Sequence, residues 1–200
     1  MVDVARQAGV APGTLYSYVE SKEALFGLVL ERASNPDVLP PTELPVRAPS
    51  TEELFDRLGK GFTWATGLPA LHAALDRKRV TDSRRELQEI VEELWDLING
   101  SRRVADVIER SARDWPELAD FFYRQLRRTL LADLTSYVER RATKGHLRPT
   151  AHPEVVARFV IETITWFARH RHGDPDTNLD DDAVRAEVVP LIVNALAPDA

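Results

Sequence analysis

Hydrophobic residues recur along most of this chain at spacings of three and four, the period of an amphipathic helix. They form three long stripes: Leu87, Ile90, Val91, Leu94 and Trp95; then Leu118, Phe121, Phe122, Leu126, Leu130, Leu134, Tyr137 and Val138; and then Val156, Phe159, Val160, Thr163, Ile164 and Phe167. No segment alternates apolar and polar residues in the way that a half-buried strand does. The pattern therefore predicts an all-α protein.

Residues that favour helix ends mark where several of these helices begin. Ser50 and Glu53 have the spacing of a capping box, which satisfies two backbone N–H groups at a helix start. Pro116 and Pro153 suit the first turn of a helix, where the missing N–H is not needed. A last helix is predicted over residues 181–197, after acidic residues that suit an N-terminus.

A proline-rich stretch over residues 34–49 divides the helical pattern. Proline lacks a backbone donor and clashes with the preceding turn, so this stretch is predicted to be a linker or an ordered loop. Its prolines are Pro36, Pro40, Pro41, Pro45 and Pro49. Apolar residues such as Val38 and Val46 indicate that it packs on something. The division predicts a small helical domain over residues 1–33 and a larger helical domain over residues 50–200.

The first 33 residues have the sequence of a helix-turn-helix. A short helix ends at Gly9, a residue that adopts positive φ at little cost. A second short helix begins near Pro12, and Ser21 is a good N-cap for a third. Leu15 and Val19 lie four residues apart and are expected to share the buried face, which leaves several hydroxyl side chains outside: Thr14, Tyr16, Ser17 and Tyr18.

This stretch closely resembles the helix-turn-helix of the TetR family of bacterial transcriptional regulators. The likeness rests on three contiguous strings, which are Val4-Ala5-Arg6-Gln7-Ala8-Gly9-Val10, Gly13-Thr14-Leu15-Tyr16-Ser17-Tyr18 and Ser21-Lys22-Glu23-Ala24-Leu25. It implies that residues 12–18 form a recognition helix that enters the major groove of DNA. The expected DNA-binding residues are Pro12, Gly13, Thr14, Tyr16, Ser17, Tyr18 and Lys22.

The resemblance also implies a further helix before Met1, so the N-terminal domain is expected to be a truncated three-helix head. Residues 1–32 hold four acidic and three basic side chains, a formal net charge of −1. A DNA-binding module usually has the opposite balance. Two hypotheses therefore stand. One is a regulator, most often a repressor, that a small apolar or aromatic effector releases from a palindromic operator. The alternative is a dimeric helical ligand-binding protein whose truncated head no longer binds DNA.

The middle of the chain supplies the aromatic residues from which an effector pocket is predicted, since ligand sites in helical domains are mostly apolar and open between helices. The candidates are Phe62, Trp64, Leu68, His72, Trp95, Phe122, Leu126 and Trp166. Plain core packing is the alternative role for each of them.

The last two helices carry apolar residues on more than one face, which in a small domain indicates burial against a second subunit. TetR-like proteins also pair through these helices. The expected homodimer interface comprises Val156, Phe159, Val160, Thr163, Phe167, Val188, Leu191 and Ile192.

Composition narrows the class of protein. The chain has 200 residues, no cysteine and a formal net charge of −6, which excludes disulfides and argues against broad nucleic-acid binding. No apolar run approaches the length of a membrane span, so a cytoplasmic protein is expected. No catalytic framework is present, so no enzyme and no cofactor are predicted. The histidines at 170 and 172 suit a solvated helix end better than a metal site.

Overall fold

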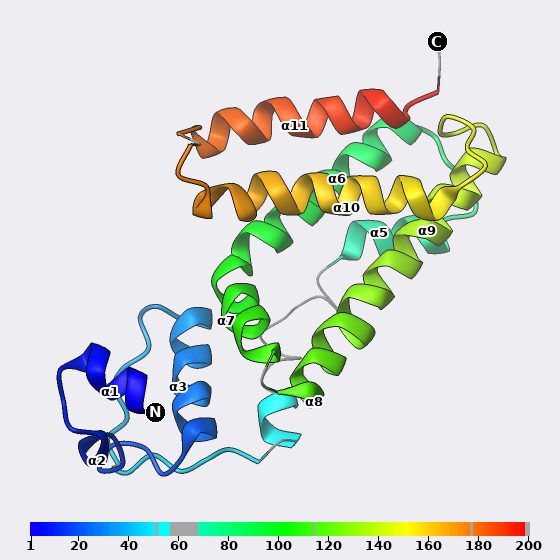
Figure 1. Cartoon of the computed structure of the whole chain (residues 1–200). Coiled ribbons are helices and arrows are strands. Elements are labelled where there is room, and N and C mark those ends of the chain that lie inside the picture. The colour runs from blue at the N-terminus through cyan, green and yellow to red at the C-terminus, as the bar shows by residue number, and fades with distance from the viewer. Residues whose placement is uncertain (51, 57–67, 114, 177, 199–200) are drawn as a thin grey trace. The chain divides into compact units, whose positions relative to one another are not determined.

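The computed structural model describes residues 1–50, 52–56, 68–113, 115–176 and 178–198. These residues are largely helical and contain no strand ladder, which confirms the predicted all-α fold (Figure 1). Contacts divide the chain into two compact units, one of Met1–Gly61 with Arg103–Ser111 and one of Phe62–Arg102 with Ala112–Ala200. We call the first the N-terminal unit and the second the helical unit. The boundaries predicted from the sequence lie after residues 33 and 49, whereas the first unit extends to Gly61 and includes Arg103–Ser111. Within the described ranges, no helix has the length and apolar character needed to span a bilayer.

The N-terminal unit holds four labelled helices: α1 Val2–Ala8, α2 Pro12–Leu15, α3 Lys22–Ser34 and most of α7 Arg102–Ala112. Residues 52–56 are helical as well. They follow the predicted capping box, in which the Ser50 N–H donates to a Glu53 carboxylate oxygen at 2.9 Å and the Glu53 N–H donates to Ser50 Oγ at 3.1 Å.

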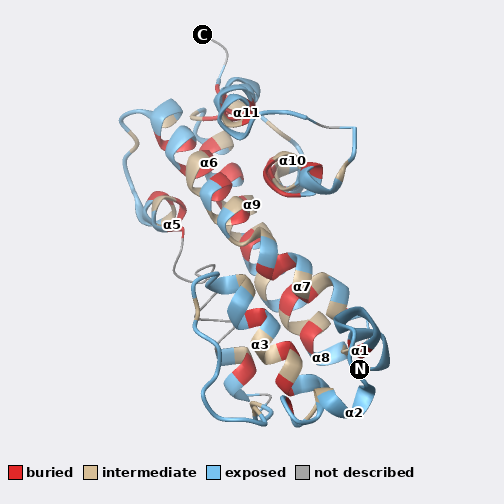
Figure 2. Ribbon diagram, turned by 90° about the vertical axis from the view of Figure 1, so that its left-hand side faces the viewer, coloured by how far each residue is buried: buried red, intermediate tan, exposed pale blue. Residues whose placement is uncertain are grey.

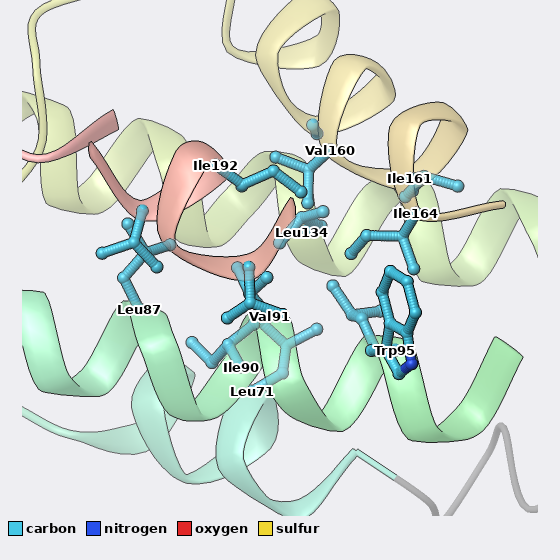
Figure 3. Packing of buried hydrophobic residues seen from close by; sticks show 14 of the residues in the cluster. Leu71, Leu87, Ile90, Val91, Trp95, Leu134, Val160, Ile161, Ile164 and Ile192 are labelled. Atoms are coloured by element: carbon cyan, nitrogen blue, oxygen red, sulfur yellow. The ribbon is translucent and has the colours of Figure 1, made fainter. Parts of the chain in front are cut away.

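The helical unit is built around α6, which packs against α10 and α11, while α9 packs against α10 and α5. Figure 3 shows side chains of α5, α6, α9, α10 and α11 converging on one hydrophobic cluster, in which Trp95 is 3% exposed. The buried residues lie on the inward faces of these helices (Figure 2). The elements are α5 Pro69–Asp76, α6 Ser83–Gly100, α8 Pro116–Ala119, η1 Asp120–Arg127, α9 Arg128–Thr143, α10 Pro153–Ala168, η2 His170–Gly173 and α11 Asp181–Leu196.

The long helix expected from Pro116 is not a uniform α-helix. Between α8 and α9 the chain forms a π-helix, η1, over Asp120–Arg127. Phe122 is buried there, and its ring meets the ring of Tyr123 edge-on, with 5.1 Å between centroids. A π turn takes more residues than an α turn, so the side chains that follow are rotated relative to a continuous 3.6-residue pattern.

The start of α5 depends on a side chain from another helix. Leu68 at the N-cap position provides no side-chain cap. Instead the Glu93 carboxylate of α6 accepts hydrogen bonds from the backbone N–H groups of Ala70, at 2.9 Å, and Leu71, at 3.2 Å. Glu93 therefore ties α5 to α6 and satisfies two donors that the helix itself leaves open.

Glu93→Ala is expected to lower the free energy of unfolding of the helical unit by about 1–3 kcal/mol, since hydrogen bonds to a charged acceptor contribute that much. Urea unfolding followed by tryptophan fluorescence measures the change. Glu92→Ala is the matched control, because Glu92 lies next to it on α6 and accepts a surface hydrogen bond from Gln88 of the same helix. Equal losses for the two variants would contradict the capping role.

Candidate nucleic-acid interface

The turn between α1 and α2 has the geometry that the sequence predicted. Gly9 follows α1 with φ 69° and ψ 26°, in the left-handed region. The Gly9 N–H donates to the Arg6 carbonyl at 3.2 Å, and the Val10 N–H donates to the Ala5 carbonyl at 3.0 Å. These are the two hydrogen bonds of a Schellman motif, which ends a helix and redirects the chain. Ala5 is fully buried, and α1 packs against α2.

Most apolar residues around this turn are exposed, although their helical spacing would allow them to face the core. Val10, which follows the turn, is 39% exposed. Val2 and Val4 on α1 are also exposed. The buried residue of α1 is Ala5.

The predicted recognition helix is shorter in the structure than in the sequence analysis. α2 begins with Pro12 and ends at Leu15, and Ala11 precedes it without a side-chain cap. The residues that follow form successive turns with i→i+3 hydrogen bonds, such as Ser17 N–H to the Thr14 carbonyl at 3.2 Å. The Ser17 hydroxyl donates to the same carbonyl at 2.6 Å, which favours a tight turn over a further α-helical turn.

The residues predicted to contact DNA all lie on the surface of this segment. Pro12, Gly13, Thr14, Tyr16, Ser17, Tyr18 and Lys22 are exposed. Tyr16 and Tyr18 have more than half of their surface free. Leu15 is half-buried and Val19 is buried, so the segment is held from its inner side while its polar side chains stay accessible (Figure 2).

Lys22 is positioned by the N-cap of α3. Ser21 Oγ accepts the backbone N–H groups of Glu23, at 3.1 Å, and Ala24, at 3.2 Å, so α3 starts at Lys22. Hydrogen bonding with Ser21 is the main cause that lowers the pKa of the Glu23 carboxyl from its usual value. The local charge is thus mixed, since Glu20 and Glu23 flank Lys22, and Arg6 on α1 pairs with Asp3 at 3.0 Å.

The proline-rich segment packs within the N-terminal unit. The sequence indicated this packing through its scattered apolar residues. Val46 forms an isolated parallel bridge with Val19. Its N–H donates to the Tyr18 carbonyl at 2.8 Å, and its carbonyl accepts the Glu20 N–H at 3.0 Å. Farther along, a Cβ on Gly27 would meet the Pro49 ring at 3.3 Å, so α3 and Pro49 are in close contact.

The residues predicted for an effector pocket lie in several environments. Phe62 and Trp64 fall outside the described residues. Leu68 and Trp95 are buried in the hydrophobic cluster, and Phe122 is buried in η1. Of the other candidates, Leu126 and His72 are half-buried, and Trp166 is exposed. His72 Nε2 lies 3.6 Å from an Asp133 carboxylate oxygen, and the ring of Trp166 meets that of Phe167 edge-on.

A hollow of about 740 Å³ lies between α9 and α10, in the size range of small-molecule sites. Glu139 of α9 and Val155 and Phe159 of α10 are among its lining residues, and none of the six predicted pocket residues that the structure describes lines it. In the part of the chain that the structure describes, no group of three or more histidine, aspartate or glutamate side chains is arranged to hold a metal ion.

The residues predicted for a dimer interface divide by burial. Val160, Val188 and Ile192 belong to the hydrophobic cluster of the protomer itself. Val156, Thr163 and Phe167 are half-buried, whereas Phe159 and Leu191 are 49% and 64% exposed. Only the second and third groups have surface left for a partner, because the first is already covered by α6 and its neighbours.

Comparison with family models gives a match over residues 1–29, to the model described as bacterial regulatory proteins, tetR family. The matched segment spans α1, α2 and the first part of α3, and it contains all seven residues proposed for DNA binding. A search of curated proteins found no match for the chain.

Proposed function

We propose that the chain, whose residues 1–29 match the model of the TetR family of bacterial regulatory proteins, is a DNA-binding transcriptional regulator that acts as a repressor on a palindromic operator. The observation that carries the proposal is the run of exposed residues that follows the Gly9 turn. In it, polar side chains occupy the outer side and Val19 the inner side of one short segment.

The proposed mode of binding places α2 and the turns after it in the major groove. Thr14, Tyr16 and Tyr18 offer hydroxyl groups to the phosphate backbone, and Lys22 offers a positive charge. Ser17 is the candidate for sequence preference, although its hydroxyl proton is engaged by the Thr14 carbonyl. Its oxygen still has lone pairs with which to accept a hydrogen bond from a base.

We propose that the regulator is a homodimer through one face of α10 and α11. Four large apolar side chains of these two helices are exposed, namely Val155, Phe159, Trp166 and Leu191. Those on α10 recur at spacings of four and seven, so they share one helix face. α10 and α11 pack side by side in the helical unit (Figure 1). A two-fold dimer would cover this apolar face and fix the separation of two recognition segments.

Phe159→Glu is expected to convert a dimer of twice 22.5 kDa into a monomer of 22.5 kDa in size-exclusion chromatography with light scattering. The physical reason is that burying an unpaired carboxylate costs several kcal/mol. Leu39→Glu is the control, because Leu39 is 84% exposed and lies outside this face. A monomeric unaltered protein, or a Phe159→Glu variant that stays dimeric, would contradict the proposed interface.

The proposed regulation is release from DNA by a small apolar or aromatic molecule bound in the helical unit. Such a ligand shifts the protein toward one state only if it binds that state more tightly. Titration of hydrophobic compounds, with tryptophan fluorescence for binding and duplex release for function, tests the two steps separately. The chain has four tryptophans for this purpose.

The net charge of the first 32 residues favours a second candidate, a dimeric helical ligand-binding protein that does not bind DNA. Its formal value is −1, whereas phosphate recognition favours an excess of basic residues. Enrichment of duplexes from a random-sequence library on the full-length protein separates the two candidates. An inverted repeat among the enriched sequences supports the regulator, and recovery of no sequence above background supports the second candidate.

A further inference from the structure

The proline-rich segment returns to the end of the proposed recognition segment. In Figure 1 the chain that leaves α3 turns back toward α2, where Val46 pairs with Val19. Two backbone hydrogen bonds fix this pairing, from Val46 to the carbonyl of Tyr18 and from Glu20 to the carbonyl of Val46. A segment joined in this way keeps a fixed register against the residues that it contacts.

The register decides which side chains lie next to one another. Successive side chains of an extended segment point to opposite sides. Val19 is buried and Val46 is half-buried, so these two point inward, while Glu20 and Arg47 after them are exposed. In a parallel pairing Arg47 is the neighbour of Glu20, and it lies on the outer side, where Tyr18 is also exposed.

The charge on Arg47 is available to a partner. Among the described residues its guanidinium makes no hydrogen bond and no ion pair, although the same unit contains arginines that do. Arg6 pairs with Asp3, and Arg32 donates to the Val38 carbonyl. Glu20, in contrast, puts a negative charge between Tyr18 and Lys22, two of the residues proposed to contact phosphate. A charge of the opposite sign beside Glu20 reduces its repulsion of DNA.

We propose that Arg47 is a further DNA-contacting residue, which the proline-rich segment brings beside Tyr18 and Glu20 and whose ligand is a backbone phosphate. The inference rests on the proposed DNA binding. A guanidinium suits this role because its planar donors match two phosphate oxygens. The proline-rich segment then contributes to recognition through the position of one side chain, since it places the Arg47 cation beside Glu20.

The test compares Arg47→Gln and Arg47→Lys with the unaltered full-length protein, on a fluorescent duplex that the unaltered protein has enriched and on a scrambled duplex. Arg47→Gln is expected to weaken both affinities by the same factor, about 5–20-fold, and to reduce the slope of log affinity against log salt by about 1. Arg47→Lys is expected to keep the slope, because the charge is retained, and to lose part of the affinity, because an ammonium group does not match two phosphate oxygens. Glu20→Gln is expected to strengthen binding to both duplexes. Circular dichroism confirms that each variant is folded.

Arg85→Gln is the charge-matched control. Arg85 lies on α6 of the helical unit and pairs with Glu89 at 3.0 Å, so its loss changes the net charge without changing the proposed interface. If Arg47→Gln leaves both affinity and slope unchanged, the proposed role of Arg47 is overturned. The proposed function still stands in that case, provided that the unaltered protein binds the enriched duplex. A loss on the enriched duplex alone would overturn the phosphate as its ligand. Failure of the unaltered protein to bind any duplex would overturn both the function and this inference.

Discussion

Arg141→Met is expected to lower the free energy of unfolding of the helical unit by about 3–5 kcal/mol, because it leaves a carboxylate buried beside fewer positive charges. Arg141 is 2% exposed and Glu86 is 3% exposed. Few surface substitutions have an effect of this size, and most stay within about 0.5 kcal/mol.

The geometry around Glu86 explains the size of the effect. Arg141 Nε donates to one carboxylate oxygen at 2.7 Å, and its Nη2 lies 3.3 Å from the other and 2.6 Å from the carbonyl of Ala74. Arg77 donates to Glu86 at 2.8 Å from the rim of the cluster. The guanidinium of Arg141 lies 5.4 Å from the ring centre of Tyr137. Burial, and secondly the charge of Glu86, raise the pKa of that tyrosine, so its phenol stays neutral.

Urea unfolding measures the change, and two further variants separate its causes. Arg140→Met removes the same charge from the adjacent position of α9, where the side chain is exposed and donates to the Leu75 carbonyl, so a small loss is expected. The double variant Glu86→Leu with Arg141→Met removes both buried charges and should recover much of the stability. Similar losses for Arg140→Met and Arg141→Met would contradict the account.

Thr14→Glu is expected to weaken binding to the enriched duplex by at least about 100-fold, because like charges brought together at an interface cost several kcal/mol. Thr14 is exposed in α2, within the segment matched by the family model. A carboxylate there would face phosphates instead of the hydroxyl that the proposed contact uses. Fluorescence anisotropy of the labelled duplex measures the affinity.

Thr81→Glu is the matched control for this second variant. Thr81 is exposed, lies in the helical unit before the N-cap of α6, and gains the same charge. Its affinity for the duplex is expected to stay within about a factor of 2, apart from the general effect of net charge. Equal weakening by both variants would mean that α2 is not the DNA-binding element.

Local signals in the sequence were sufficient to place the candidate site. Gly9, Pro12 and Ser21 each have a strong preference for a helix end, and the structure has helix ends at all three. The capping box of Ser50 and Glu53 also forms as predicted. These features depend on a few consecutive residues, so they are visible without knowledge of the tertiary structure.

Features that depend on distant contacts were not predictable in the same way. The pairing of Val46 with Val19 joins residues far apart in sequence, and helical periodicity carries no information about it. The burial of Arg141 is similar, because a charged residue in an amphipathic helix is expected on the outer face. The apolar face of α10 did not reveal which of its residues are buried in the protomer's own core, as Val160 is, and which stay exposed, as Trp166 does.

The central claim is that this chain recognises a specific DNA sequence through the exposed segment after Gly9. The most direct measurement is the affinity of the full-length protein for the enriched duplex and for a scrambled duplex at the same salt concentration. The account predicts a preference of at least about 1,000-fold for the enriched duplex, and an affinity for that duplex that Thr14→Glu lowers by at least about 100-fold. Equal affinity for the two duplexes, or an affinity for the enriched duplex that Thr14→Glu leaves unchanged, would contradict it.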